Sequence, residues 1–277
     1  MIKDLIVSLS VGDGITDKAG PYAISIAEAF EAHVLGVGFV YDPVIPGAVM
    51  GGIPPEFIES QRREADAFAR KALTQFEQAA KRAAVSYETL TANDSIGGAT
   101  DRITRLARRF DLAVVGQAEP DRTAVEETIA EGVLFGAGRP VVVVPFIQKK
   151  GIDLDHVMVC WDGSQAAARA IGDAMPFLKQ ARQVEIVIVG NDPGKKDEIP
   201  GVDLGKHLAR HGLKVDVKRL TAPDLDVTNT LLSYAADSDT TFMVMGGYGH
   251  SRLREFVLGG ATRGILSSMT VPTLMSH

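Results

Sequence analysis

A glycine-rich stretch near the carboxyl end of the chain holds the residue type that can wrap a backbone around a phosphate. The sequence GGYGHSRLREFVLGGAT, residues 246–262, has glycines at positions 246, 247, 249, 259 and 260. Glycine permits positive φ angles and close approach of the backbone, so that several N–H groups can converge on one anion. Glycine also loses the most conformational freedom on folding, which makes such a stretch costly. The stretch is therefore either an ordinary turn or a ligand-binding loop.

The elements on either side of this stretch favour the ligand-binding alternative. The apolar run FMVM, 242–245, predicts a strand that ends at Gly246, and LGGATRGILSS, 258–268, predicts a helix that begins around Gly260. The start of a helix presents unpaired N–H groups and a partial positive charge, which suit a phosphate. We expect the phosphate-binding residues to be Gly246, Gly249, Gly259, Gly260, Ala261 and Thr262, the last also through its hydroxyl.

A second polar segment, WDGS at 161–164, follows another apolar run, HVMVC at 156–160. In open α/β sheets, ligands bind beyond the carboxyl ends of the strands, where the strand order reverses. If the first strand of this half is central, Asp162 and Gly246 face one crevice. Asp162 could there accept a hydrogen bond from a ribose hydroxyl or a base amine, or help to hold a metal ion. Its alternative role is to cap the following helix.

For the other polar residues of this half, a structural or solvent-exposed role explains the sequence as well as a role in binding a ligand or a metal does. His250 lies in the glycine loop, where it could touch phosphate or face solvent. His207 and His211 have the i, i+4 spacing of a zinc pair on a helix, but two ligands alone do not make a zinc site. Cys160 lies in an apolar run and is predicted to be an inert buried thiol. Exposed helix or loop positions are the expectation for Arg252, Arg254 and Arg263.

The sequence contains an internal repeat, and this repeat predicts the fold class. The segments LTANDSIGGATDRITRLARRFDLAVVG, 90–116, and LTAPDLDVTNTLLSYAADSDTTFMVMG, 220–246, align without a gap. Short β-branched runs alternate with helical patterns in both halves, as in βαβ units with covered parallel strands. We predict an α/β fold of two tandem doubly wound domains, each a five-stranded parallel sheet with helices on both faces. The polar segment QKKG at 148–151 separates domain 1–147 from domain 152–277.

The first half keeps the pattern of the fold but lacks the features of the site. Ser10 stands where Asp162 stands in the second half, and of the early glycines only Gly116 remains. Bulky or acidic residues occupy the following segment, where phosphates would lie: Pro120, Asp121, Glu126 and Glu127. Because negative charge disfavours an anion, this half is predicted not to bind ATP. We therefore predict that the fold does not require these glycines, and a ligand is the simplest reason for them in the second half.

Composition limits the classes of partner. The net charge of −6 and the pI near 5.6 argue against nucleic acid or an anionic membrane as the main partner. No signal peptide or stretch of about 18 apolar residues is found, and a single cysteine fits a reducing compartment. We expect a cytoplasmic protein with no membrane and no nucleic-acid partner.

Three known motifs do not fit the glycine stretch. A Walker A loop needs Gly-Lys-Ser/Thr after its spacer, which is missing. The dinucleotide fingerprint needs its glycines after the first strand, whereas these follow the fourth. The Gly-His at 249–250 is also the end of an adenylyltransferase motif, but its first position is Gly247 and it too follows the wrong strand.

The spacing Gly246–x2–Gly249–x9–Gly259 resembles the G-2x-G-9x-G motif of the universal stress protein family. The segments VCWDGS and TVPTLM resemble the start and the end of that family's domain, and the resemblance covers both halves. It implies an adenine nucleotide alpha hydrolase-like fold and a stress-response role without a defined metabolic reaction. It also implies ATP, or ADP or AMP, in the crevice, with Mg²⁺ as a further candidate, and pairing through the last strands. Gly260 departs from the family, which has Ser or Thr there, and Thr262 is the nearest hydroxyl.

These inferences together give one functional hypothesis and two rivals. The hypothesis is a nucleotide-dependent regulator with at most slow ATP hydrolysis, acting on a protein partner that the sequence does not identify. The two domains would form a pseudo-dimer through strands 141–144 and 273–275, with a further homodimer as an option. One rival is a nucleotide-independent scaffold that works through the apolar, Pro- and Gly-rich loop at 41–57. The other, an ATP-consuming enzyme, lacks a recognisable catalytic set.

Overall fold

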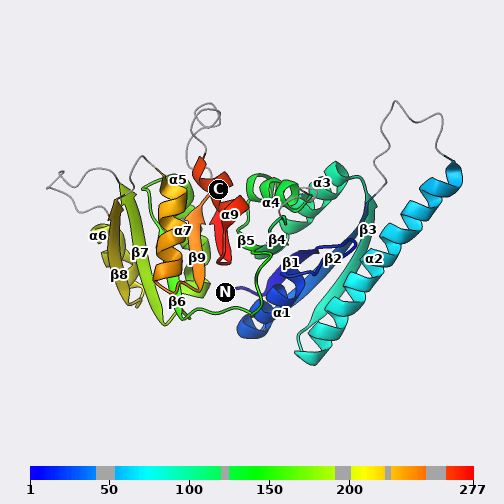
Figure 1. Ribbon diagram of the computed structural model, residues 1–277. Coiled ribbons are helices and arrows are strands. Elements are labelled where there is room, and N and C mark those ends of the chain that lie inside the picture. The colour runs from blue at the N-terminus through cyan, green and yellow to red at the C-terminus, as the bar shows by residue number, and fades with distance from the viewer. Residues whose placement is uncertain (42–53, 120–124, 191–200, 222–225, 248–259) are drawn as a thin grey trace. The chain divides into compact units, whose positions relative to one another are not determined.

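The computed structural model describes residues 1–41, 54–119, 125–190, 201–221, 226–247 and 260–277. The chain divides into two compact units, Met1–Ala137 and Gly138–His277. Each is a mainly parallel sheet with helices packed against it, as Figure 1 shows. The predicted fold class is confirmed. Most of the loop at 41–57 and the segment 120–124 lie outside the described residues.

The first unit has the strand order β3-β2-β1-β4, with the pairs of β1 and β2 parallel. The central strand is therefore β1, and the strand order reverses between β1 and β4. Helices α1 and α2 contact each other, as do α3 and α4, so the sheet has a helix layer on each face. The bounds are β1 Asp4–Leu9, α1 Ala19–Phe30, β2 His33–Tyr41, α2 Pro55–Arg82, β3 Tyr87–Asp94, α3 Ile96–Ala107, β4 Leu112–Gly116 and α4 Val125–Gly136.

The second unit has the strand order β5-β10-β9-β6-β7-β8. Its pairs are parallel except that of β10 with β5, and the order reverses between β6 and β9, as expected. The bounds are β5 Val141–Val144, β6 His156–Cys160, α5 Gln165–Leu178, β7 Gln183–Gly190, α6 Val202–Arg210, β8 Val215–Thr221, α7 Val227–Asp237, β9 Phe242–Gly246, α9 Gly260–Ser268 and β10 Thr273–Ser276.

The inner strands form the core because their residues are apolar on both sides. All four residues of β5 are buried valines, and Val157, Met158 and Val159 of β6 have no exposed surface. Parallel strands covered by helices on both faces read as continuous apolar runs rather than alternating ones. The edge strands β3 and β8 instead carry exposed polar residues, as edges commonly do.

Strand β5 comes from the first sequence repeat but lies in the second compact unit. It pairs antiparallel with β10, with Val142 opposite Leu274. The repeat therefore divides the chain at 148–151, whereas the contacts divide it after Ala137. The division into domains 1–147 and 152–277 follows the repeat and stays a prediction.

Gly246 is required by packing between β9 and α5. A Cβ atom at this position would lie 2.6 Å from the carbonyl carbon of Ala166 and would also clash with the backbone nitrogen of Ala167. Real Cβ atoms do not approach a backbone so closely, and helix backbone cannot move aside as a flexible side chain can. Only glycine therefore lets the first turn of α5 pack on the end of β9.

We predict that Gly246→Ala lowers the free energy of unfolding by about 1–3 kcal/mol, because the helix backbone must shift to make room. Gly172→Ala is the matched control, since a Cβ at this exposed position within α5 meets no atom within 4 Å. Alanine should there raise stability by about 0.5–1 kcal/mol through its helix propensity. Urea unfolding followed by circular dichroism measures both changes. Equal effects of the two substitutions would contradict the packing role.

Candidate functional site

The second unit brings two of the predicted segments to one edge of its sheet. Strands β6 and β9 are parallel neighbours, with Val159 opposite Val244. The segment 161–164 follows β6, and Gly246 is the last residue of β9. Both therefore lie at the carboxyl edge, at the point where the strand order reverses. This is where an open α/β sheet binds its ligands.

Asp162 shapes the turn between β6 and α5 but is not the helix cap. Its Oδ1 accepts a hydrogen bond of 2.9 Å from the backbone N–H of Ser164, and Gly163 between them has φ +79°. The cap of α5 is Ser164, whose Oγ accepts from the N–H of Ala167 at 3.1 Å. Asp162 is exposed at this edge, so its carboxylate is accessible to a ligand.

Burial raises the pKa of the neighbouring Cys160 thiol to about 12, and the negative charge of Asp162 adds to this rise. Because the thiolate is the reactive form, this thiol is unreactive near neutral pH. This agrees with the inert role predicted for Cys160, although the residue is half-buried rather than buried.

Helix α9 begins at Gly260, where the sequence predicts it. Thr228 at the start of α7 donates a hydrogen bond of 3.4 Å to the carbonyl of Ala261, and a Cβ at Gly264 would lie 2.7 Å from the Thr228 hydroxyl. These contacts fix the first turn of α9 against α7. Thr262 in that turn is buried. Of the predicted site residues, Gly249, His250 and Gly259 lie outside the described residues.

Gly247 is tied to the end of the last strand. Its backbone N–H donates to the carbonyl of Ser276 at 2.8 Å, and its carbonyl lies 3.0 Å from Nδ1 of His277. These bonds extend the pairing of β9 with β10 by one residue. The backbone that leaves β9 is therefore held in place before it enters the segment 248–259.

The corresponding edge of the first unit is occupied by carboxyl groups of the chain itself. Asp17 is half-buried and accepts the N–H of Ser10 at 3.2 Å through Oδ1 and that of Gly20 at 3.0 Å through Oδ2. Burial raises the Asp17 pKa to about 6, and the negative charge of Glu126 adds to the rise. The sequence analysis missed Asp17. Its position three residues before Gly20, at the start of a helical pattern, is a capping signal that could have found it.

The part of the chain that the structure describes holds no group of three or more His, Cys, Asp and Glu side chains placed for a metal. The rings of His207 and His211 meet edge to face with centroids 4.9 Å apart. The zinc alternative for this pair therefore gains no third ligand of these types among the described residues. None of the described helices is long and apolar enough to span a bilayer.

Comparison with known proteins gives a consistent relationship, although no family model matches the chain. A universal stress protein of Synechocystis sp. is 23% identical over 192 residues, which are 68% of this chain and 65% of the relative. The match thus spans just under two thirds of that relative's length.

Solved structures show the same fold over the whole chain. A universal stress protein from Archaeoglobus fulgidus DSM 4304 has a TM-score of 0.69 at 17% identity, over 99% of this chain and 95% of that one. A functionally unknown protein from Pseudomonas aeruginosa PAO1 has a TM-score of 0.61 at 14% identity, over 99% and 92%. The resemblance indicated by the glycine spacing is confirmed: the chain is similar in sequence to one universal stress protein and in fold to solved ones, and it is about twice the size of a single domain of that family.

Proposed function

We propose that the second repeat binds ATP, or the related ADP or AMP, at the carboxyl edge between β6 and β9. The observation that carries this proposal is the meeting of two features at one reversal of strand order. These are the exposed carboxylate of Asp162 and the end of β9 at Gly246. The G-2x-G-9x-G segment and the start of α9 at Gly260 follow β9 in the chain. The protein would act as a nucleotide-dependent regulator in the response to stress.

Each part of a nucleotide has a matching group in this arrangement. The N–H groups at the start of a helix suit phosphates, and Gly260, Ala261 and Thr262 form the first turn of α9. The carboxylate of Asp162 suits a ribose hydroxyl or a base amine, because it is acceptor-only when ionised. Mg²⁺ would be held mainly by the phosphates, since such sites use few protein carboxylates.

The first repeat is proposed not to bind a nucleotide in this way. Glu126 lies at the start of α4, the helix that corresponds to α9, and its charge raises the pKa values of both Asp17 and Tyr41. An incoming phosphate would meet the same negative potential, which disfavours an anion. The two repeats would thus divide their work, with one nucleotide site in the chain.

The pairing of β5 with β10 supports the proposed pseudo-dimer, because it joins the closing strands of the two sequence repeats. A further homodimer, a protein partner and a cytoplasmic location belong to the same proposal. The scaffold alternative rests on the loop at 41–57, of which residues 42–53 lie outside the described part of the chain.

We predict that calorimetric titration of the purified protein with ATP gives one site per chain. Asp162→Asn should weaken binding by about 10–100-fold, since a hydrogen bond to a charged group contributes about 1.5–3 kcal/mol. Gly259→Val should weaken it at least as much by blocking backbone approach. Gly97→Val is the matched control, because a Cβ at this position in α3 meets nothing within 4 Å, and it should leave the affinity unchanged.

Failure of the wild-type protein to bind ATP, ADP or AMP at millimolar concentration would refute the nucleotide site. Unchanged affinity in both site variants would place the site elsewhere. Rapid turnover of ATP would favour the enzyme alternative instead of the regulator.

The carboxyl group of Asp17 at the edge of the first unit makes the stability of the fold depend on pH. The folded pKa of Asp17 is raised from 3.8 to about 6, so folding favours its protonated form. The resulting stabilisation is present in full below pH 3.8 and is lost as the pH rises through about 6; about 3 kcal/mol is at stake. We expect Asp17→Asn to remove this part of the pH dependence between pH 4 and 7, and the exposed Asp101→Asn to leave it intact.

Two spectroscopic signals distinguish the unfolding of the second unit from the unfolding of the whole chain. Circular dichroism follows unfolding of the whole chain, whereas the only tryptophan, Trp161, reports on the second unit. The Asp17 effect should therefore be seen in the dichroism and be absent from the tryptophan fluorescence. If the free energy of unfolding measured by circular dichroism changes equally with pH in the wild type and in Asp17→Asn, then Asp17 does not titrate in this range.

A further inference from the structure

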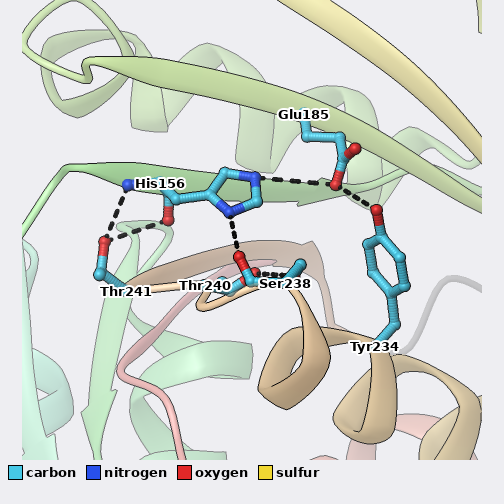
Figure 2. A network of polar contacts seen from close by, with 6 residues as sticks. All are labelled: His156, Glu185, Tyr234, Ser238, Thr240 and Thr241. Atoms are coloured by element: carbon cyan, nitrogen blue, oxygen red, sulfur yellow. Dashed lines mark hydrogen bonds and ion pairs between the residues drawn. The ribbon is translucent and has the colours of Figure 1, made fainter.

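A buried polar network lies at the amino-terminal edge of the second unit, at the opposite ends of the strands from the proposed nucleotide site. His156 is the first residue of β6, Glu185 lies on the neighbouring strand β7, and Tyr234 comes from α7, as Figure 2 shows. The side chains of His156 and Glu185 are each only 12% exposed. Charged or polar groups that are so buried need well-matched partners.

The hydrogen-bond partner of Nδ1 in the His156 ring shows that this nitrogen carries a proton. Nδ1 lies 2.8 Å from the backbone carbonyl oxygen of Ser238. A carbonyl oxygen can only accept a hydrogen bond, so Nδ1 must carry a proton and donate it. The backbone on the other side of His156 is held as well, because its N–H donates to Oγ1 of Thr241 at 3.1 Å. The ring therefore has a fixed orientation.

The other ring nitrogen, Nε2, is buried and has no hydrogen-bond partner. It lies 3.7 Å from Oε2 of Glu185, and that oxygen already accepts the hydroxyl of Tyr234 at 2.8 Å. In a neutral ring with its proton on Nδ1, Nε2 is an acceptor facing another acceptor, which leaves a buried group unsatisfied. A proton on Nε2 turns the same pair into a donor and a carboxylate.

The charges around the pair favour that proton. Glu185 of β7 is the negative group in direct reach of the ring, and Tyr234 of α7 donates to it as a neutral phenol. The pKa of Tyr234 is raised to about 12, first by burial and then by its bond to Glu185, so it adds no negative charge near neutral pH. The Lys218 ammonium of β8 lies 6.0 Å from the Tyr234 ring centre, on the tyrosine rather than on the histidine. Asp155, next to His156 in the chain, forms an exposed ion pair with Arg182.

The first unit has a related pair with the two residue types exchanged. Asp4 begins β1 and lies opposite His33, which begins β2. His33, however, is not buried, and its Nδ1 bonds to the hydroxyl of Ser86 at 2.9 Å, which can donate or accept. Asp4 interacts electrostatically with His33, so this pair has the same two charge types. Because it lies in the first unit, a substitution of His33 is a control for measurements that report on the second unit.

We propose that His156, Glu185, Tyr234 and the Ser238 carbonyl form a proton-operated latch in the second unit. With both ring nitrogens protonated, the imidazolium bridges Glu185 of β7 and the end of α7, and Tyr234 binds the same carboxylate. When the proton leaves Nε2, the ring loses its ion pair with Glu185, and the end of α7 keeps only part of its attachment to the sheet. The latch is closed at lower pH and opens as the pH rises.

The direct test is the ring protonation of the full-length protein by ¹⁵N NMR with labelled histidine. At pH 7.5 we expect the His156 ring to be the doubly protonated imidazolium. Glu185→Gln should convert His156 to the neutral form, with its proton on Nδ1. The wild-type spectrum decides without any variant: a neutral His156 ring at pH 7.5 would overturn the proposal.

Stability gives a second, independent measurement. The unfolded ring releases its proton above about pH 6.5 while the closed latch keeps it, so the unfolding equilibrium constant should rise by up to tenfold per pH unit until the latch opens. Trp161 fluorescence follows this transition in the second unit. Glu185→Gln should flatten the pH slope and His33→Gln should leave it unchanged. An equal slope in the wild type and in Glu185→Gln would also overturn the latch.

Discussion

The close contact between Gly246 and the first turn of α5 positions the carboxyl edge of the second unit. Because β9 ends against the backbone of Ala166 and Ala167, the turn at 162–164 is held beside the end of β9. A larger residue at 246 would push α5 away and separate the two segments. Packing alone thus requires a glycine at position 246, independently of the proposed ligand, but it does not account for the other glycines of the stretch.

Strand β6 carries functional candidates at both of its ends. Asp162 follows its carboxyl end, and His156 begins it at the other. The two residues lie in different environments: Asp162 is exposed, whereas the His156 ring is enclosed by β7 and α7. Exposure suits a group that exchanges a ligand with solvent, and burial suits a group whose protonation alters packing. Helix α7 contacts α9 through Thr228 and ends at Asp237, directly before Ser238, so it runs from one region to the other.

The fold could be predicted from the sequence because the signals for it are local and repeated. Buried strands appear as continuous apolar runs, the two halves align without a gap, and Gly260 marks the start of a helix. The role of Gly246 was only partly accessible. The loss of glycines in the first half suggested that the fold does not need them, but the contact with Ala167 depends on how closely a particular helix approaches, which no residue pattern encodes. Ser164 rather than Asp162 caps α5, although both are good capping residues.

The buried polar groups could not be predicted in the same way. His156, Glu185 and Tyr234 are separated by tens of residues, and each alone is an unremarkable residue in a strand or a helix. Their chemistry exists only when three elements pack together. Asp17 is intermediate, because its capping role is a local signal whereas its raised pKa depends on burial and on Glu126 from a distant helix.

Strand β5 shows that the boundary between the sequence repeats and the boundary between the compact units fall at different places in this chain. By sequence it closes the first repeat, yet it belongs to the second unit, where it pairs with β10. A recombination event or a cloning boundary at 148–151 would transfer a complete repeat but leave β10 with an open edge, the feature that drives strand-to-strand aggregation. A fragment intended to fold as the second unit must therefore begin at Gly138, so that it includes β5 from the first sequence repeat.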